Sequence, residues 1–134
     1  MTADILDALT RYLGQQEQLA MLIQHRLYPD ALPTKCRLPA VRMVEVDVVN
    51  ERVSLTGYSG LRRARIQFDI FAAQRSITLA VADVLSALMN GKCIEGVGCK
   101  LWVLSEKQAG QIDGVTEIRR RILEFSILCQ EDLV

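Results

Sequence analysis

The chain has 134 residues, half of them apolar, and its sixteen basic residues are balanced by sixteen acidic ones, giving a formal net charge of zero. This length and hydrophobicity predict one folded domain and exclude intrinsic disorder. A neutral chain has no overall attraction to nucleic acid or to an anionic membrane. No apolar run could span a bilayer, and residues 1–13 lack the pattern of a signal peptide, so we expect cytoplasmic synthesis and no membrane partner.

The cysteines and the single histidine do not match a metal or disulfide pattern. There is no Cys-x-x-Cys pair, and His25 lies eleven residues from the nearest cysteine, Cys36. No nucleotide-binding glycine motif is present either. We therefore predict no metal and no cofactor. Cys129 is interpreted as a small buried hydrophobe and His25 as a helix-end residue.

Three helices are predicted from apolar residues at helical spacing. The first can be capped by Thr2 and ends at Gly14; its apolar stripe is Ile5, Leu6, Leu9, Tyr12 and Leu13. The second covers residues 16–25. The third covers residues 76–90, with Ser76 as its cap, and its long apolar stripe predicts that it covers a sheet.

Two strands are predicted before the third helix, from alternating apolar and polar residues. In residues 40–49, the valines at 44, 46 and 48 share the predicted core face. The second strand ends near Ala72, and its core residues are Ala64, Ile66, Phe68, Ile70 and Ala72. Pairing positions that sum to 112 brings Val44 opposite Phe68, Val46 opposite Ile66, Val48 opposite Ala64 and Asp47 opposite Arg65. Residues 50–61 form a long connection.

Two further strands are predicted after the third helix. Residues 100–105 form a short apolar strand, and residues 106–115 are polar enough to be an exposed connection. Residues 116–130 form the last strand, with Leu123, Phe125, Ile127 and Cys129 on one face. The prediction is an α+β domain with a mainly antiparallel four-stranded sheet and helices packed on one face, in the order α-α-β-β-α-β-β.

Several short motifs occur in this order along the chain. A turn with the pattern Leu-x-Gly-x-Ser-Gly-Leu-Arg is formed by Leu55, Gly57, Ser59, Gly60, Leu61 and Arg62, and it leads into Arg65, Gln67, Asp69 and Ala72. Before it stand Arg26, Tyr28 and Pro29, then Leu38 and Pro39; after it stand Arg119, Arg120, Arg121, Leu123 and Phe125. Together these motifs resemble the tail-completion, or tail-terminator, proteins of long-tailed bacteriophages and prophages.

The resemblance implies a structural protein rather than an enzyme. Proteins of that family form a ring, commonly of six subunits, at the head-proximal end of the tail tube. The ring stops tube growth and provides the surface on which the filled head docks. The implied partners are copies of the same chain, the tail tube protein and head-tail connector proteins, while DNA only passes through. The implied location is the host bacterial cytoplasm during assembly and then the virion tail.

Three alternatives remain open at this stage. The first is a head-tail connector, or neck, protein of the same virion region, which would also form a ring. The second is a nucleic-acid-binding module that uses the arginine-rich segments, although neutral charge and only 5% aromatic residues argue against tight binding. The third is an enzyme or small-ligand domain, for which the sequence has no positive feature.

Arginine dominates the candidate interface residues. Twelve of the sixteen basic residues are arginines, and arginine suits interface ion pairs because its planar group binds carboxylates through two nitrogens. The candidate subunit or partner interface residues are Leu55, Tyr58, Leu61, Arg62, Arg63, Arg65, Arg119, Arg120 and Arg121. Either these arginines bind acidic residues of a neighbouring subunit, or they form a solvated sheet face with Glu45 and Asp47.

Overall fold

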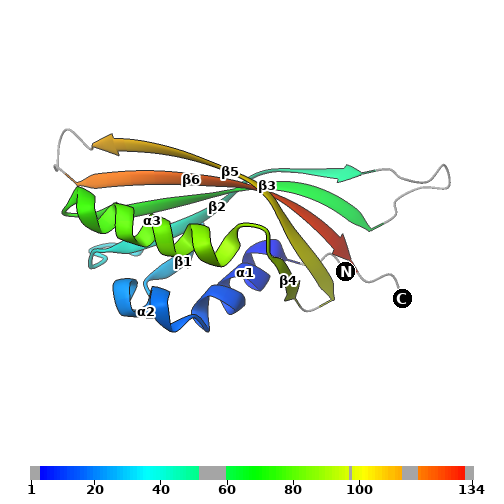
Figure 1. Ribbon diagram of the computed structural model, residues 1–134, viewed down its shortest axis with the longest axis horizontal. Helices are drawn as coiled ribbons and strands as arrows, with labels where there is room; N and C mark the ends of the chain where they lie inside the picture. Colours follow the sequence, from blue (N-terminus) through cyan, green and yellow to red (C-terminus); the bar gives the residue numbers. More distant parts are fainter. Residues whose placement is uncertain (1–3, 52–59, 97, 113–117, 132–134) are drawn as a thin grey trace.

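The structure is a computed structural model that describes residues 4–51, 60–96, 98–112 and 118–131. Its elements are α1 (Ile5–Gly14), α2 (Glu17–Ile23), β1 (Leu27–Pro29), β2 (Ala40–Glu51), β3 (Leu61–Ala72), α3 (Arg75–Met89), β4 (Cys93–Gly96), β5 (Cys99–Ile112) and β6 (Arg119–Glu131). The strands form one sheet in the order β1-β2-β3-β6-β5-β4. All three helices lie on one face of it (Figure 1). We call this the inner face and the opposite one the outer face.

The predicted four-stranded antiparallel sheet is wrong. The sheet has six strands and is mixed, because β1 pairs in parallel with β2 while the other pairs are antiparallel. The two missed strands are short. β1 has three residues and lies in the proline-containing segment, and β4 has four residues and ends at Gly96. Neither is long enough to show alternation, so the predicted element order was also wrong.

The length of β5 is a second correction. Residues 106–112, predicted to be part of a connection, continue the strand and pair with β6 as far as Ile112 opposite Arg119. Their polar character misled the prediction. Glu106 and Gln108 both bond Ser86 of α3, so polar side chains replace apolar ones under this helix.

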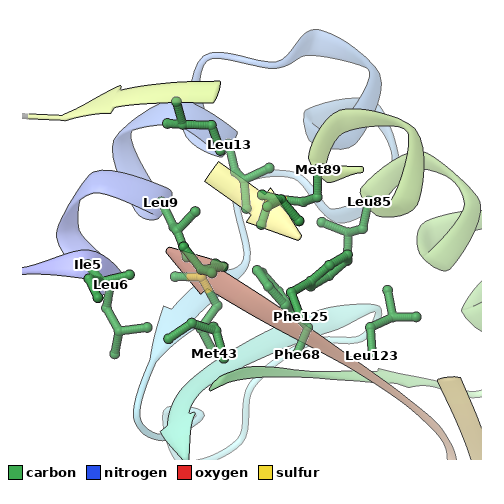
Figure 2. Packing of buried hydrophobic residues seen from close by; sticks show 14 of the residues in the cluster. Ile5, Leu6, Leu9, Leu13, Met43, Phe68, Leu85, Met89, Leu123 and Phe125 are labelled. Atoms are coloured by element: carbon green, nitrogen blue, oxygen red, sulfur yellow. The ribbon is translucent and has the colours of Figure 1, made fainter. Parts of the chain in front are cut away.

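The two central strands, β3 and β6, confirm the predicted alternation. The five predicted core residues of β3 and the four of β6 are fully buried. Phe68 and Phe125 meet edge to face with their ring centroids 5.4 Å apart. Figure 2 shows Leu9 of α1 and Leu85 of α3 directed toward these rings from the helical layer. The core therefore lies between the inner face and the helices.

A β-bulge in β2 overturns part of the predicted core face. The register shifts between Glu45 and Asp47, so Val46 is an extra residue and is 41% exposed. Beyond the bulge the predicted pairs Asp47 with Arg65 and Val48 with Ala64 are confirmed. Before the bulge the strand is shifted by one residue, and Met43, not Val44, faces Phe68 and is fully buried.

The N-caps of α1 and α3 are Asp4 and Gln74, each two residues from the predicted cap. Asp4 caps α1, since its Oδ1 accepts from the backbone N–H of Leu6 at 3.0 Å; Thr2 lies outside the described residues. The helix starts at Arg75 in α3, so Ser76 is not its cap. The predicted apolar stripe of α1 is confirmed, because Ile5, Leu6, Leu9 and Leu13 are buried and Tyr12 packs on the core.

Close contacts hold the two short edge strands, β4 and β1, in place. A Cβ at Gly96 would lie 2.8 Å from the Cβ of Ala8, so only glycine allows α1 and β4 to approach this closely. At the other edge, Arg26 donates from Nε to the carbonyl of Pro39 at 2.8 Å, and the Val41 N–H donates to the carbonyl of Arg26 at 2.9 Å. Two residues of the motifs quoted above therefore hold β1 beside β2.

Candidate interface on the outer face of the sheet

The six candidate arginines do not form one cluster. They stand at the starts of β3 and β6, and these neighbouring strands are antiparallel, with Leu61 opposite Gln130 and Ala72 opposite Arg119. The two groups therefore lie at opposite ends of the sheet, with Arg65 and Arg120 about 20 Å apart along the strands at about 3.4 Å per residue. They also divide between the faces, since alternate residues of a strand point to opposite sides.

Arg62 belongs to the inner face and is buried. Its Nη2 lies 2.7 Å from Oε1 of Glu131, which is itself 9% exposed, and 3.8 Å from the Cys129 sulfur. Burial raises the pKa of the Cys129 thiol to about 11, so this cysteine stays protonated. No disulfide joins the four cysteines. The Arg62–Glu131 ion pair connects the start of β3 to the end of β6.

Arg65 lies on the outer face and bridges three strands. Its Nε and Nη2 both donate to Oδ2 of Asp47 on β2, at 2.9 and 2.6 Å, and its Nη1 reaches Oε1 of Glu124 on β6 at 3.4 Å. The hydrogen bond from Arg65 lowers the pKa of Asp47 below its usual value. All three side chains remain partly exposed, so the group is a charged, accessible patch.

The most enclosed charge on the outer face is Asp69, which is fully buried. One of its carboxylate oxygens accepts from Arg42 on β2, with Nε at 3.0 Å. The other accepts from Nε2 of Gln67 at 2.8 Å and lies 3.0 Å from Nη2 of Arg120 on β6. Burial alone would raise the pKa of Asp69, but these hydrogen bonds outweigh it and hold the pKa below the usual value.

An aromatic ring completes the Asp69 cluster. The guanidinium carbons of Arg42 and Arg120 lie 5.7 and 5.6 Å from the centroid of the Phe71 ring, within cation–π range. We call Arg42, Gln67, Asp69, Phe71 and Arg120 the Asp69 cluster. Sequence reasoning identified Arg120 but missed Arg42 and Asp69 as its partners. The signal was present, because Gln67 and Asp69 are both residues of the motif that carries the family resemblance.

The other candidate residues have varied surroundings. Arg63 is exposed on the outer face, opposite Val49 and Leu128. Arg121 lies on the inner face, half-buried, with its Nη1 3.4 Å from Oε1 of Gln108, while Arg119 and Leu61 are half-buried. Leu55 and Tyr58 lie outside the described residues, and whether any of these residues contacts a partner stays a prediction.

The arginines fit the solvated-face interpretation only in part. Arg65 does pair with Asp47 on a solvated face, as that interpretation expected. Glu45 lies opposite Ile66, and burial raises its pKa. Arg120 and Arg62 are held by carboxylates of the same chain. Arg65 is held by carboxylates of the same chain as well, but Arg63 and Arg65 are exposed to solvent, whereas Arg62 is buried and Arg120 is half-buried.

The hollows found in the described surface lie away from the candidate arginines. A hollow of about 200 Å³ lies between α1 and α2, lined mainly by apolar side chains and by His25, and it is smaller than typical ligand pockets. Among the described residues, no three His, Cys, Asp or Glu side chains gather where they could hold a metal. No helix in these residues is long and apolar enough to cross a membrane.

Comparisons with known proteins add a likeness of fold. The sequence matches no protein-family profile and no curated relative. A chain from the virion of a native gene transfer agent particle superposes with a TM-score of 0.68 and 20% identity, over 93% of each chain. A second solved structure, which carries no descriptive name, has a TM-score of 0.65 and 14% identity over 98% of this chain and 100% of its own. A component of that virion therefore has this fold over almost the entire length of its chain.

Proposed function

We propose that this chain is a structural subunit of a phage or prophage tail, of the tail-completion type. It forms a ring, six-membered as in the family it resembles, at the head-proximal end of the tail tube. The ring ends tube growth and allows the head to join. The observation that carries the proposal is the likeness to a chain of a virion particle over 93% of both chains. The motifs between Arg26 and Phe125 give it the finer tail-completion role.

A ring subunit needs accessible surfaces rather than a reaction centre. The outer face supplies one, because none of the described helices covers it (Figure 1) and it carries the accessible charged group of Arg65, Asp47 and Glu124 across three strands. In this proposal the neighbours are further copies of the chain, the tube protein on one side and the head-tail connector on the other. DNA is cargo that passes through the ring. The protein assembles in the host cytoplasm and remains in the virion tail.

Tube length measures this function directly. Purified tail tube protein is assembled with and without this chain, and tube lengths are compared by electron microscopy. A terminator is expected to halt growth and to appear at one tube end only. Tubes that grow equally long in its presence would contradict the proposal. Copurification with DNA-filled heads instead of tubes would favour the neck protein.

The arginine hypothesis needs a variant that leaves the subunit folded. Charge reversal at Arg120 would leave the buried Asp69 facing a like charge, so a loss of assembly could reflect misfolding. Arg63→Glu is the better test, because Arg63 is exposed on the outer face. We expect it to weaken ring assembly, and thermal melting of the variant separates a lost contact between subunits from a loss of stability. A gel shift of DNA that survives physiological salt would favour the nucleic-acid-binding alternative.

A further inference from the structure

The sheet has two open edges on opposite sides. β1 pairs with β2 only from Val41 to Met43, and β4 pairs with β5 only from Cys99 to Trp102. Among the described residues, no strand lies beside the rest of either strand on that side. We call residues 44–51 of β2 the β2 edge and residues 104–112 of β5 the β5 edge. Each presents unpaired backbone groups that can accept another strand.

Exposed apolar side chains concentrate on these two edges. Four large hydrophobic residues are exposed in the described parts of the chain: Met21, Val46, Val49 and Leu104. Three of them lie on the β2 or β5 edge, and only Met21, on α2, does not. Val46 and Leu104 both stand at the bulge of their strand. Bulges and charged residues can protect an edge from pairing, but here the residue at each bulge is apolar and exposed, which indicates a contact surface.

The two edges have complementary charge. Glu45 and Asp47 on the β2 edge are exposed, and the described part of this edge has no basic side chain. Lys107 on the β5 edge is also exposed. Within the same edge, Glu106 is directed under α3 and bonded to Ser86. Lysine therefore supplies the accessible charge of the β5 edge, and it is opposite in sign to that of the β2 edge.

The geometry suits a second copy of the same chain. β2 and β5 are antiparallel within the subunit, so the β5 edge of one copy meets the β2 edge of the next in antiparallel pairing. By register, the β2 edge is level with residues 61–67 of β3, and the β5 edge with residues 65–72. If the centres of the two edges are paired, each copy is displaced along the strand direction by about 15 Å relative to the copy before it. The four long strands of one copy, β2, β3, β6 and β5, span about 19 Å across the sheet. The resulting strand tilt is about 38°, within the 35–45° of closed barrels.

We propose that successive copies join head to tail, with the β2 edge of one subunit paired in antiparallel fashion to the β5 edge of the next. The contact is heterologous, so it generates a closed ring or an open filament and never a symmetric dimer. Closure into a ring rests on the function proposed above, whereas the edge pairing does not. Val46, Val49 and Leu104 are the apolar part of the contact, and Lys107 lies on the same face as Asp47, an exposed carboxylate of the β2 edge that also accepts from Arg65.

Two single-edge variants test the inference. Val46→Lys disables the β2 edge and Leu104→Lys disables the β5 edge, while Met21→Lys makes the same change at an exposed residue off both edges. Native mass spectrometry over a concentration series is expected to give large assemblies for the wild type and Met21→Lys, and monomers for each edge variant alone. An equimolar mixture of the two edge variants should stop at dimers, because only one intact pair of edges remains.

Three results would overturn the inference. An edge variant that assembles like the wild type places the contact elsewhere, and an edge variant that dimerises alone shows a symmetric contact. A wild-type chain that stays monomeric to millimolar concentration rules out edge pairing in the free protein, while the tube-length assay still decides the proposed function. Thermal melting confirms that each variant is folded. Val49→Lys and Ala109→Lys, both at exposed positions, replace the first pair if either does not fold.

Discussion

The two central strands and the two strands that flank them differ in regularity. β3 and β6 alternate without interruption and bury every second side chain in the core. β2 and β5 each contain a bulge, one at Val46 and one at Leu104, and each has a long unpaired edge among the described residues. The central pair thus supplies buried core residues that stabilise the fold, whereas the regular alternation of the flanking strands is interrupted at exposed positions. A bulge re-aims side chains, and here it turns an apolar residue outward.

The largest expected effect tests the central pair. Phe125→Ala removes a fully buried ring that packs edge to face on Phe68. We expect the free energy of unfolding to fall by about 3–5 kcal/mol, measured by urea denaturation. Ser126→Ala, at the next residue on the outer face, is the control and should change it by less than about 0.5 kcal/mol. Equal effects of both substitutions would show that the core does not lie on the inner face.

The Asp69 cluster extends the comparison to the outer face of the same central strands. Asp69→Asn keeps the shape of the side chain but leaves Arg42 and Arg120 without their shared negative charge. We expect a loss of about 3 kcal/mol, the lower end for a broken buried ion pair, because both arginines are about 30% exposed. Asp47→Asn, the same change at an exposed carboxylate, should cost far less. If the two losses are similar, burial of Asp69 does not strengthen its ion pairs.

The same cluster predicts how stability depends on pH. The pKa of Asp69 is lower in the folded chain than its ordinary value, so its contribution is present above the unfolded pKa of about 3.9 and is lost as pH falls through the folded pKa. The stability difference between the wild type and Asp69→Asn should therefore be constant near neutral pH and shrink below about pH 4. Urea midpoints at several pH values measure it. A difference that stays constant between about pH 4 and about pH 2 would contradict a titrating Asp69.

The sequence predicts the central strands, β3 and β6, better than the flanking strands, β2 and β5. Strict alternation is a strong signal, so the buried residues of β3 and β6 were predicted from the sequence. A single extra residue reverses the alternation, and nothing in the valine-rich run of β2 marks Val46 as that residue. Polar residues 106–112 were predicted to be a loop because their partners on α3 are distant in sequence. The arginines were identified by type, but their separation depends on strand pairing, which single residues do not encode.

The smallest expected effect tests how a flanking strand stays on the helix layer. Ser86 of α3 donates to Glu106 of β5, which also accepts from Asn90 at 3.4 Å, so polar contacts hold α3 to β5 where apolar packing ends. Ser86→Ala should cost about 1 kcal/mol in urea denaturation, the usual net value of one hydrogen bond. Asp83→Ala, at an exposed residue one turn earlier in α3, is the matched control and should have almost no effect. If the two substitutions are equivalent, residues 106–112 are held by pairing with β6 alone, and the β5 edge is ordered without the helix.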